Sequence, residues 1–227
     1  MKTNLTLILA VALCAALSCS RPTSVGKFSQ RERDIIEKSD SVMYVYTLHE
    51  PLDTAVLRTK CVPLDPEEIS SPLFKTLTAK MMATVQSPQQ DGVGLAATQV
   101  GLTHRVIVVL RYDKPGEPFG IYPNARLLSH SDSTVVGPEG CLSFPPYRGD
   151  VTRYTSVVVG YTDPVTLQSV CDTVYGYSAI IFQHELDHLD GTIYKDKAPS
   201  TWEDGAWKAE RDSLGKVGLY LRPSWMK

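Results

Sequence analysis

Early in the chain, one segment has apolar residues at the spacing of a helix. Ser71 and Pro72 are typical of a helix start, and Pro88 lies where such a helix must have ended. Between them the apolar positions recur every four residues, which places them on one helix face. They are Leu73, Leu77, Met81 and Val85, with Phe74 beside them. The pattern predicts an amphipathic helix that packs against a core.

Shorter apolar runs predict strands downstream of this helix. Residues 106–110 form a continuous apolar run that is typical of a buried strand, and Pro123-Asn124 indicates a turn after it. Residues 156–161 and 170–175 are rich in β-branched side chains and flank Asp163-Pro164, which predicts a hairpin. With a second helix late in the chain, these elements predict an α+β domain with a mostly antiparallel sheet.

The late helix contains candidate metal-binding residues. It is expected to run from about Ser178 to Asp190 and to end at Gly191. It contains Gln-His-Glu-Leu-Asp-His at residues 183–188. At about 100° per residue, the two histidines lie about 40° apart on one face, with the glutamate on the same side. Two such imidazoles can bind one metal ion while the carboxylate reaches a water molecule. The five-residue pattern is also short enough to occur by chance on a solvated helix. It indicates a metal site only if further ligands are found elsewhere in the chain.

The helix lacks a third metal ligand, and two other segments could complete the site. Glu139-Gly140-Cys141-Leu142-Ser143 supplies a cysteine, a candidate third ligand. Residues 92–99, Gly-Val-Gly-Leu-Ala-Ala-Thr-Gln, are expected to form an irregular segment whose small residues allow close approach to the backbone.

These three segments together resemble the three motifs of peptide deformylases, in that family's order. The resemblance covers roughly residues 43 to 198. It implies the α+β fold of that family and one divalent metal ion, Fe²⁺ or Zn²⁺. It also implies hydrolysis of the formyl group from N-formylmethionyl peptides, with release of formate. A monomer is expected.

The resemblance also assigns roles within the site. Cys141, His184 and His188 would bind the metal ion, and Glu185 would transfer protons. The second ring nitrogen of His184 needs an acceptor that the sequence does not identify.

Other residues would contact the substrate. The side-chain amide of Gln99 and the backbone N–H of Leu142 would stabilise the oxyanion. The expected peptide-binding residues are Gly92, Val93, Gly94 and Arg148. Glu139 and Arg153 are expected to form a structural ion pair rather than to act in catalysis.

Two departures from the family pattern border the expected methionine pocket. They are Gly137-Pro138, before Glu139, and Pro145-Pro146-Tyr147 after the cysteine motif. A metallopeptidase or amidase of different specificity that reuses the site therefore stays open as an alternative.

Composition and net charge limit the classes of partner that this protein can bind. The chain has 227 residues, enough for one domain with a real core, and 43% of them are hydrophobic. A net charge of −2 argues against nucleic-acid binding by a basic surface.

The N-terminus predicts export. Lys2 precedes an apolar stretch, Leu5 to Leu17, that has the length of a signal-peptide core and is too short to span a bilayer. It ends at Ala-Leu-Ser-Cys19, which resembles the lipobox of bacterial lipoproteins and implies a lipid anchor in the membrane at Cys19. Two alternatives stay open: ordinary secretory cleavage, and a start at Met43 that would give an active cytoplasmic enzyme.

The expected organisation has four parts. Residues 1–19 are a signal peptide, 20–42 a charged and partly helical surface tether, 43–198 the deformylase domain, and 199–227 a C-terminal extension. Five apolar residues could dock this extension on the domain: Trp202, Trp207, Leu214, Leu219 and Trp225. Cys61 and Cys171 are expected to be two buried free thiols, although export would permit a disulfide.

Overall fold

A computed structural model describes residues 25–215 and 222–226 of the chain. The expected signal peptide and Cys19 lie outside the described residues. The helices are α1 (Gln30–Lys38), α2 (Pro51–Leu57), α3 (Pro66–Ile69), α4 (Pro72–Val85), α5 (Gly176–Leu189) and α6 (Gly205–Gly215). The strands are β1 (Gly94–Ala96), β2 (Val106–Leu110), β3 (Phe119–Pro123), β4 (Arg126–His130), β5 (Thr134–Gly140), β6 (Tyr147–Tyr154), β7 (Ser156–Thr162), β8 (Ser169–Tyr175) and β9 (Trp202–Glu203). Short 3-10 turns lie at Ala97–Val100, Tyr194–Asp196 and Ser224–Met226.

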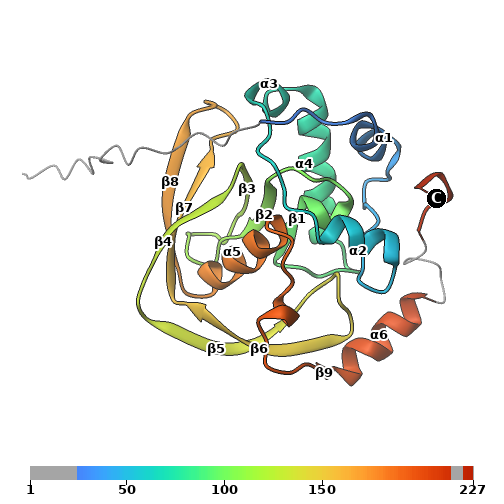
Figure 1. Cartoon of the computed structure of the whole chain (residues 1–227), viewed down its shortest axis with the longest axis vertical. Coiled ribbons are helices and arrows are strands. Elements are labelled where there is room, and N and C mark those ends of the chain that lie inside the picture. The colour runs from blue at the N-terminus through green and yellow to red at the C-terminus, as the bar shows by residue number, and fades with distance from the viewer. Residues whose placement is uncertain (1–24, 216–221, 227) are drawn as a thin grey trace, which may run out of the picture.

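Three small antiparallel sheets surround α5. Their strand orders are β1-β2-β3, β4-β7-β8 and β5-β6-β9. Helix α5 contacts strands of all three sheets, and Figure 1 shows it at the centre of the molecule, with α1, α3 and α4 at the upper end and α2 at the right. The metal-motif helix is therefore the centre of the fold. Among the described residues, no helix has the length and apolar character that a membrane span requires.

Helix α4 forms where the apolar spacing predicts it. The Ser71 hydroxyl accepts a hydrogen bond from the backbone of Phe74, and Pro72 occupies the first turn. Leu77, Met81 and Val85 are buried as expected, and a further buried position is taken by Phe74 instead of Leu73, which is only half-buried.

The predicted strand at residues 106–110, the turn at Pro123-Asn124 and the β7–β8 hairpin are confirmed. The structure corrects the expectation of an irregular segment at residues 92–99. Gly94–Ala96 form β1, paired with Ala96 opposite Ile107, and a 3-10 turn follows. The strand was missed because it is only three residues long and two of them, Gly94 and Ala96, are small, so no period-2 alternation can be recognised.

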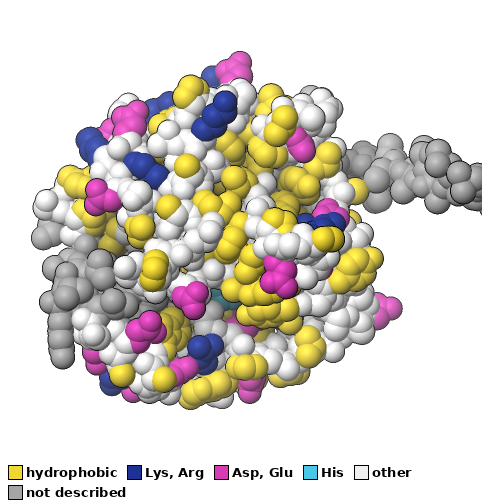
Figure 2. Space-filling view, turned by 180° about the vertical axis from the view of Figure 1, so that it is seen from behind, with side chains coloured by type: hydrophobic (Ala, Val, Ile, Leu, Met, Phe, Trp, Pro, Cys, Tyr) yellow, Lys and Arg dark blue, Asp and Glu magenta, His cyan; other side chains and the backbone are white. Residues whose placement is uncertain are grey.

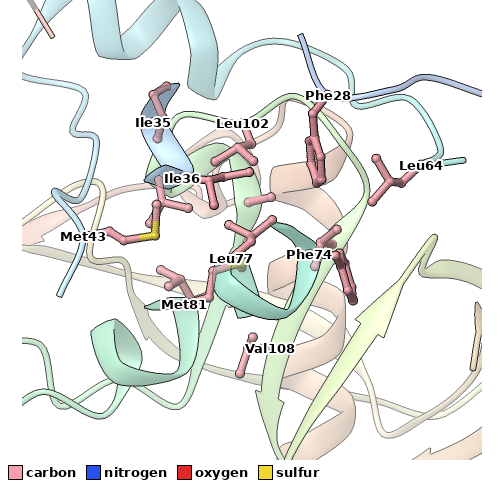
Figure 3. Packing of buried hydrophobic residues seen from close by; sticks show 14 of the residues in the cluster. Phe28, Ile35, Ile36, Met43, Leu64, Phe74, Leu77, Met81, Leu102 and Val108 are labelled. Carbon is pink, nitrogen blue, oxygen red and sulfur yellow. The ribbon is translucent and has the colours of Figure 1, made fainter. Parts of the chain in front are cut away.

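The expected surface tether is wrong for residues 25–42. Phe28, Ile35 and Ile36 are each at most 4% exposed and pack against the core residues of α4, as Figure 3 shows. The charged residues of α1 concealed this role, because they outnumber its two isoleucines and most of them lie on its outward side, with Glu32 as the buried exception. A capping box was the available signal: Ser29 accepts from Glu32, and Glu32 accepts from the Ser29 backbone.

Polar contacts also fix α1 on the domain. Glu32 is buried and accepts hydrogen bonds from the Thr103 backbone (2.8 Å) and from His104 (3.0 Å). Burial would raise its pKa, but the hydrogen bonds from His104 and Thr103 outweigh burial and hold the pKa at about 2. From α4, the Lys80 ammonium donates to the backbone carbonyls of Ile36 and Ser39 at the end of α1.

The C-terminal extension is docked as expected, but through few of the predicted residues. Trp202 lies in β9, which pairs with β6, and Trp207 contacts Arg148. Trp225 remains partly exposed, and the side chains of Leu214 and Leu219 lie outside the described part of the chain. Instead, Arg222 forms an ion pair with the fully buried Asp53 (3.0 Å).

Cys61 and Cys171 are both free thiols. Cys61 is buried, as predicted, but Cys171 is exposed, because it lies on the outward face of β8, where residues 169, 171, 173 and 175 are all exposed.

Candidate active site

The three predicted metal ligands converge beneath a cleft. The Cys141 sulfur lies 3.1 Å from Nε2 of His188, and the ligand atoms of Cys141, His184 and His188 all lie within 4.8 Å of one another. Both histidines come from α5, whereas Cys141 follows β5 on another sheet. One thiolate and two imidazoles form a donor set that suits Zn²⁺ and Fe²⁺.

At this site, two buried polar atoms have no hydrogen-bond partner among the described residues. They are Oε2 of Glu185 and Nδ1 of His188. Glu185 is 3% exposed, and burial raises the pKa of its carboxyl to about 7. A polar oxygen left unpaired beside three ligand atoms fits a site that also takes a cation and water. The residues present therefore fit a divalent metal ion.

Glu139 supplies the acceptor that the sequence left unidentified for His184. Its Oε2 lies 2.8 Å from Nδ1 of His184, which directs Nε2 of that ring toward the metal ligands. Arg153 donates to both carboxylate oxygens of Glu139 (2.6 and 2.9 Å), so the expected ion pair is present. Burial would raise the pKa of Glu139, but the hydrogen bonds from Arg153 and His184 prevail and hold it at about 2. Glu139 thus remains a carboxylate and fixes the orientation of the ring.

This network continues along α5. Arg153 also donates to Asp187 (2.6 Å), and Lys197 donates to the other oxygen of Asp187 (2.7 Å). Asp187 stands between the histidines in the motif, but its side chain serves the ion-pair network. No local spacing predicts this contact, because Lys197 lies beyond the helix.

The predicted oxyanion donors lie beside the cysteine. The Gln99 amide nitrogen lies 3.7 Å from the Cys141 sulfur and 3.3 Å from the Ser143 hydroxyl, and its amide oxygen accepts from the Ala96 backbone (2.8 Å). These contacts orient the Gln99 side chain toward the ligands. Leu142 lines the same cleft.

The cleft brings together nearly all the predicted site residues. Its volume is about 780 Å³, and its lining includes Gly92, Val93, Gly94, Gln99, Cys141, Leu142, Arg148, His184 and Glu185. His188 lies behind this lining, against Cys141. A Cβ atom on Gly94 would collide with Glu185, which explains the glycine there. Figure 2 shows histidine at the bottom of a hollow on this face.

Comparisons with known proteins agree with this geometry. The polypeptide deformylase family model matches residues 43–203. The peptide deformylase of Symbiobacterium thermophilum is 39% identical over 160 residues, 69% of this chain and 70% of that protein. That of Roseiflexus castenholzii is 32% identical over 166 residues, 68% of this chain and 87% of that protein.

The chain belongs to the polypeptide deformylase family. Solved structures support the same conclusion. A class I type b peptide deformylase from Acinetobacter baumannii, bound to Met-Ala-Ser, has a TM-score of 0.61 and 32% identity, covering 69% of this chain and 98% of that chain. The peptide deformylase of Thermotoga maritima has a TM-score of 0.60 and 31% identity, covering 70% and 99%. The expected family, fold class and enzyme class are confirmed.

Proposed function

We propose that this deformylase acts through a divalent metal ion held by Cys141, His184 and His188, with Glu185 as the proton-transfer residue. The observation that carries this assignment is the convergence of the three ligand atoms beside a buried carboxylate at the bottom of one cleft. The reaction is hydrolysis of the formyl amide of N-formylmethionyl peptides.

When bound, the ion supplies Lewis acidity that activates water and polarises a carbonyl group. Glu185 accepts a proton from the attacking water as the water oxygen bonds to the formyl carbon. The same carboxyl then delivers this proton to the amine nitrogen as the C–N bond breaks. The products are formate and a peptide with a free amino terminus.

The developing oxyanion needs positioned donors. The Gln99 amide, held by the Ala96 backbone, and the backbone N–H of Leu142 fill this role. Because the Gln99 carbonyl oxygen is already occupied by Ala96, its NH₂ group faces the cleft, and the donor polarity of this side chain is fixed.

The peptide backbone is expected to bind along β1. This strand pairs with β2 on one side only, so it is an edge strand, and residues 92–94 leading into it line the cleft. An extended peptide can add to such an edge through main-chain hydrogen bonds. The Acinetobacter baumannii relative bound to Met-Ala-Ser holds the tripeptide that deformylation of formyl-Met-Ala-Ser leaves.

Hydrolysis of formyl-Met-Ala-Ser tests this function. We expect formate release from formyl-Met-Ala-Ser and at least about 100-fold slower hydrolysis of acetyl-Met-Ala-Ser, because a small acyl group must fit between the ligands and the oxyanion donors. Formate detection and mass spectrometry measure both. Cleavage of unformylated Met-Ala-Ser would instead indicate a peptidase, and hydrolysis of the acetyl peptide at the same rate a broader amidase.

We also propose that the enzyme is exported and anchored by lipid at Cys19. The support is the order of Lys2, the apolar stretch and the lipobox-like sequence. The packing of residues 28–36 on the core adds support, because translation from Met43 would omit them.

Export also bears on the identity of the metal ion. In an oxidising exterior an Fe²⁺–thiolate site degrades, so the expected ion is Zn²⁺. Elemental analysis of protein from its own compartment decides this.

Cys19→Ala is expected to block lipidation and to move the protein out of the membrane fraction. Two or three acyl chains give stable anchoring, whereas one chain gives only marginal binding. Fractionation with N-terminal mass spectrometry measures this. Cys14→Ala is the matched control, since Cys14 would be removed with the signal peptide. An unmodified protein with its N-terminus at Met43 would contradict export.

A further inference from the structure

The C-terminal extension reaches the active-site cleft through β9. In β9, Trp202 and Glu203 pair with Arg148 and Tyr147 of β6, and the Asp204 backbone donates to the Pro146 carbonyl (2.9 Å). Tyr147 and Arg148 lie four and five residues after Ser143, the last residue of the cysteine motif. The family model ends at residue 203, so the residues that follow lie beyond the matched domain.

Asp204 fixes both the start of α6 and the Arg148 side chain. Its Oδ1 accepts from the backbones of Ala206 and Trp207, each at 3.1 Å, which caps the helix. Its Oδ2 accepts from Nε of Arg148 at 2.7 Å. The Arg148 guanidinium lies 5.5 Å from the centre of the Trp207 ring, a cation–π distance. Arg148 is therefore held by the C-terminal extension on two sides.

Trp207 stands beside the metal-binding segment. A Cβ atom on Gly140 would lie 3.2 Å from the indole ring, and Gly140 directly precedes the metal ligand Cys141. Four residues of the extension line the active-site cleft: Asp204, Ala206, Trp207 and Glu210. A cleft of about 780 Å³ is within the range that holds a drug-sized ligand, so it has room for several residues of a peptide.

The mouth of this cleft carries excess negative charge. Of its acidic lining residues, Glu139 is paired with Arg153, and Asp204 with Arg148. Asp91 and Glu210 are exposed, and neither forms an ion pair within the described part of the chain. In Figure 2, acidic side chains and a basic one surround the hollow. Such a mouth attracts cationic groups and disfavours acidic ones.

We propose that residues 204–210 form a wall of the peptide-binding cleft, in which Trp207 contacts, and Glu210 selects, side chains that follow the formylmethionine. This inference rests on the proposed deformylase function. The selected class is formylated peptides with basic or apolar residues after methionine. A signal peptide begins with such a basic stretch. An exported deformylase that meets signal-peptide fragments would encounter this class of substrate.

The charge selection is tested with three matched peptides. The ratio of kcat/KM between formyl-Met-Lys-Ser and formyl-Met-Glu-Ser is expected to be about tenfold in wild type, with formyl-Met-Ala-Ser between them, and to fall with added salt. Glu210→Lys should lower the ratio by about fivefold. Asp212→Lys makes the same charge change on α6 outside the cleft lining and should leave the ratio near wild type. Equal ratios in wild type and Glu210→Lys would overturn the charge selection.

The apolar contact is tested with Trp207→Ala. Its kcat/KM for formyl-Met-Ala-Ser is expected to fall about tenfold, mainly through KM. Trp207→Phe should restore most of the loss. Trp202→Ala, in the same extension but outside the cleft lining, is the control and should stay near wild type. Unchanged kinetics in Trp207→Ala with active wild type would refute the wall alone. A wild type that deformylates none of the peptides would refute the proposed function and this inference together.

Discussion

Glu185→Gln is expected to keep its metal ion and to lose turnover by about 10²–10⁴-fold. Glu185 is buried beside the candidate ligands but is not one of them, since the atoms that converge come from Cys141, His184 and His188. Glutamine has nearly the same shape but cannot carry the proton from water to the leaving amine. Elemental analysis beside kcat for formyl-Met-Ala-Ser measures both parts of the expectation.

Two variants make this result specific. Cys141→Ala should lose metal content and activity together, because it removes a ligand. Asp190→Asn should keep both, because Asp190 ends α5 and pairs with Arg105 away from the cleft. Loss of metal from Glu185→Gln would show that Glu185 is a ligand, and a wild-type rate would remove it from proton transfer.

A chain that starts at Met43 is expected to fold poorly or to melt more than about 10 °C below the full domain. It lacks Phe28, Ile35 and Ile36, all buried against α4 and its neighbours. Each such side chain contributes about 1.5–3 kcal/mol by burial, and the sum approaches the ~5–15 kcal/mol of a whole domain. The buried His104 would also lose its partner Glu32. This reverses the expectation that a start at Met43 leaves an active enzyme.

Thermal melting by circular dichroism and soluble yield measure this effect. A chain beginning at residue 25 is the control, because it omits only residues that the structure does not describe. In that background, Ile36→Ala should cost about 2–5 kcal/mol of unfolding free energy, since Ile36 is fully buried. Equal melting temperatures for the chains starting at residues 25 and 43 would show that α1 contributes nothing to the core.

The sequence alone determined part of the candidate site, because two of its three candidate metal ligands are encoded by short, local spacing. On a helix, His184, Glu185 and His188 share a side whatever surrounds them. Helix α4 and the β7–β8 hairpin were predictable for the same reason, since helix period, capping and turn residues are local signals. Cys141 could be placed as a third ligand only because its segment resembled a family motif.

Only the tertiary structure decided which distant residues meet. Glu139 became the acceptor for His184 because β5 runs past α5, and no spacing in the chain encodes that contact. From the sequence alone, α1 resembles a charged tether. Only the fold shows that its two isoleucines pack in the core. The wall of Asp204 and Trp207 exists because β9 pairs with β6. Such contacts depend on strand pairing and helix packing between segments far apart in sequence, which local patterns of polarity do not specify.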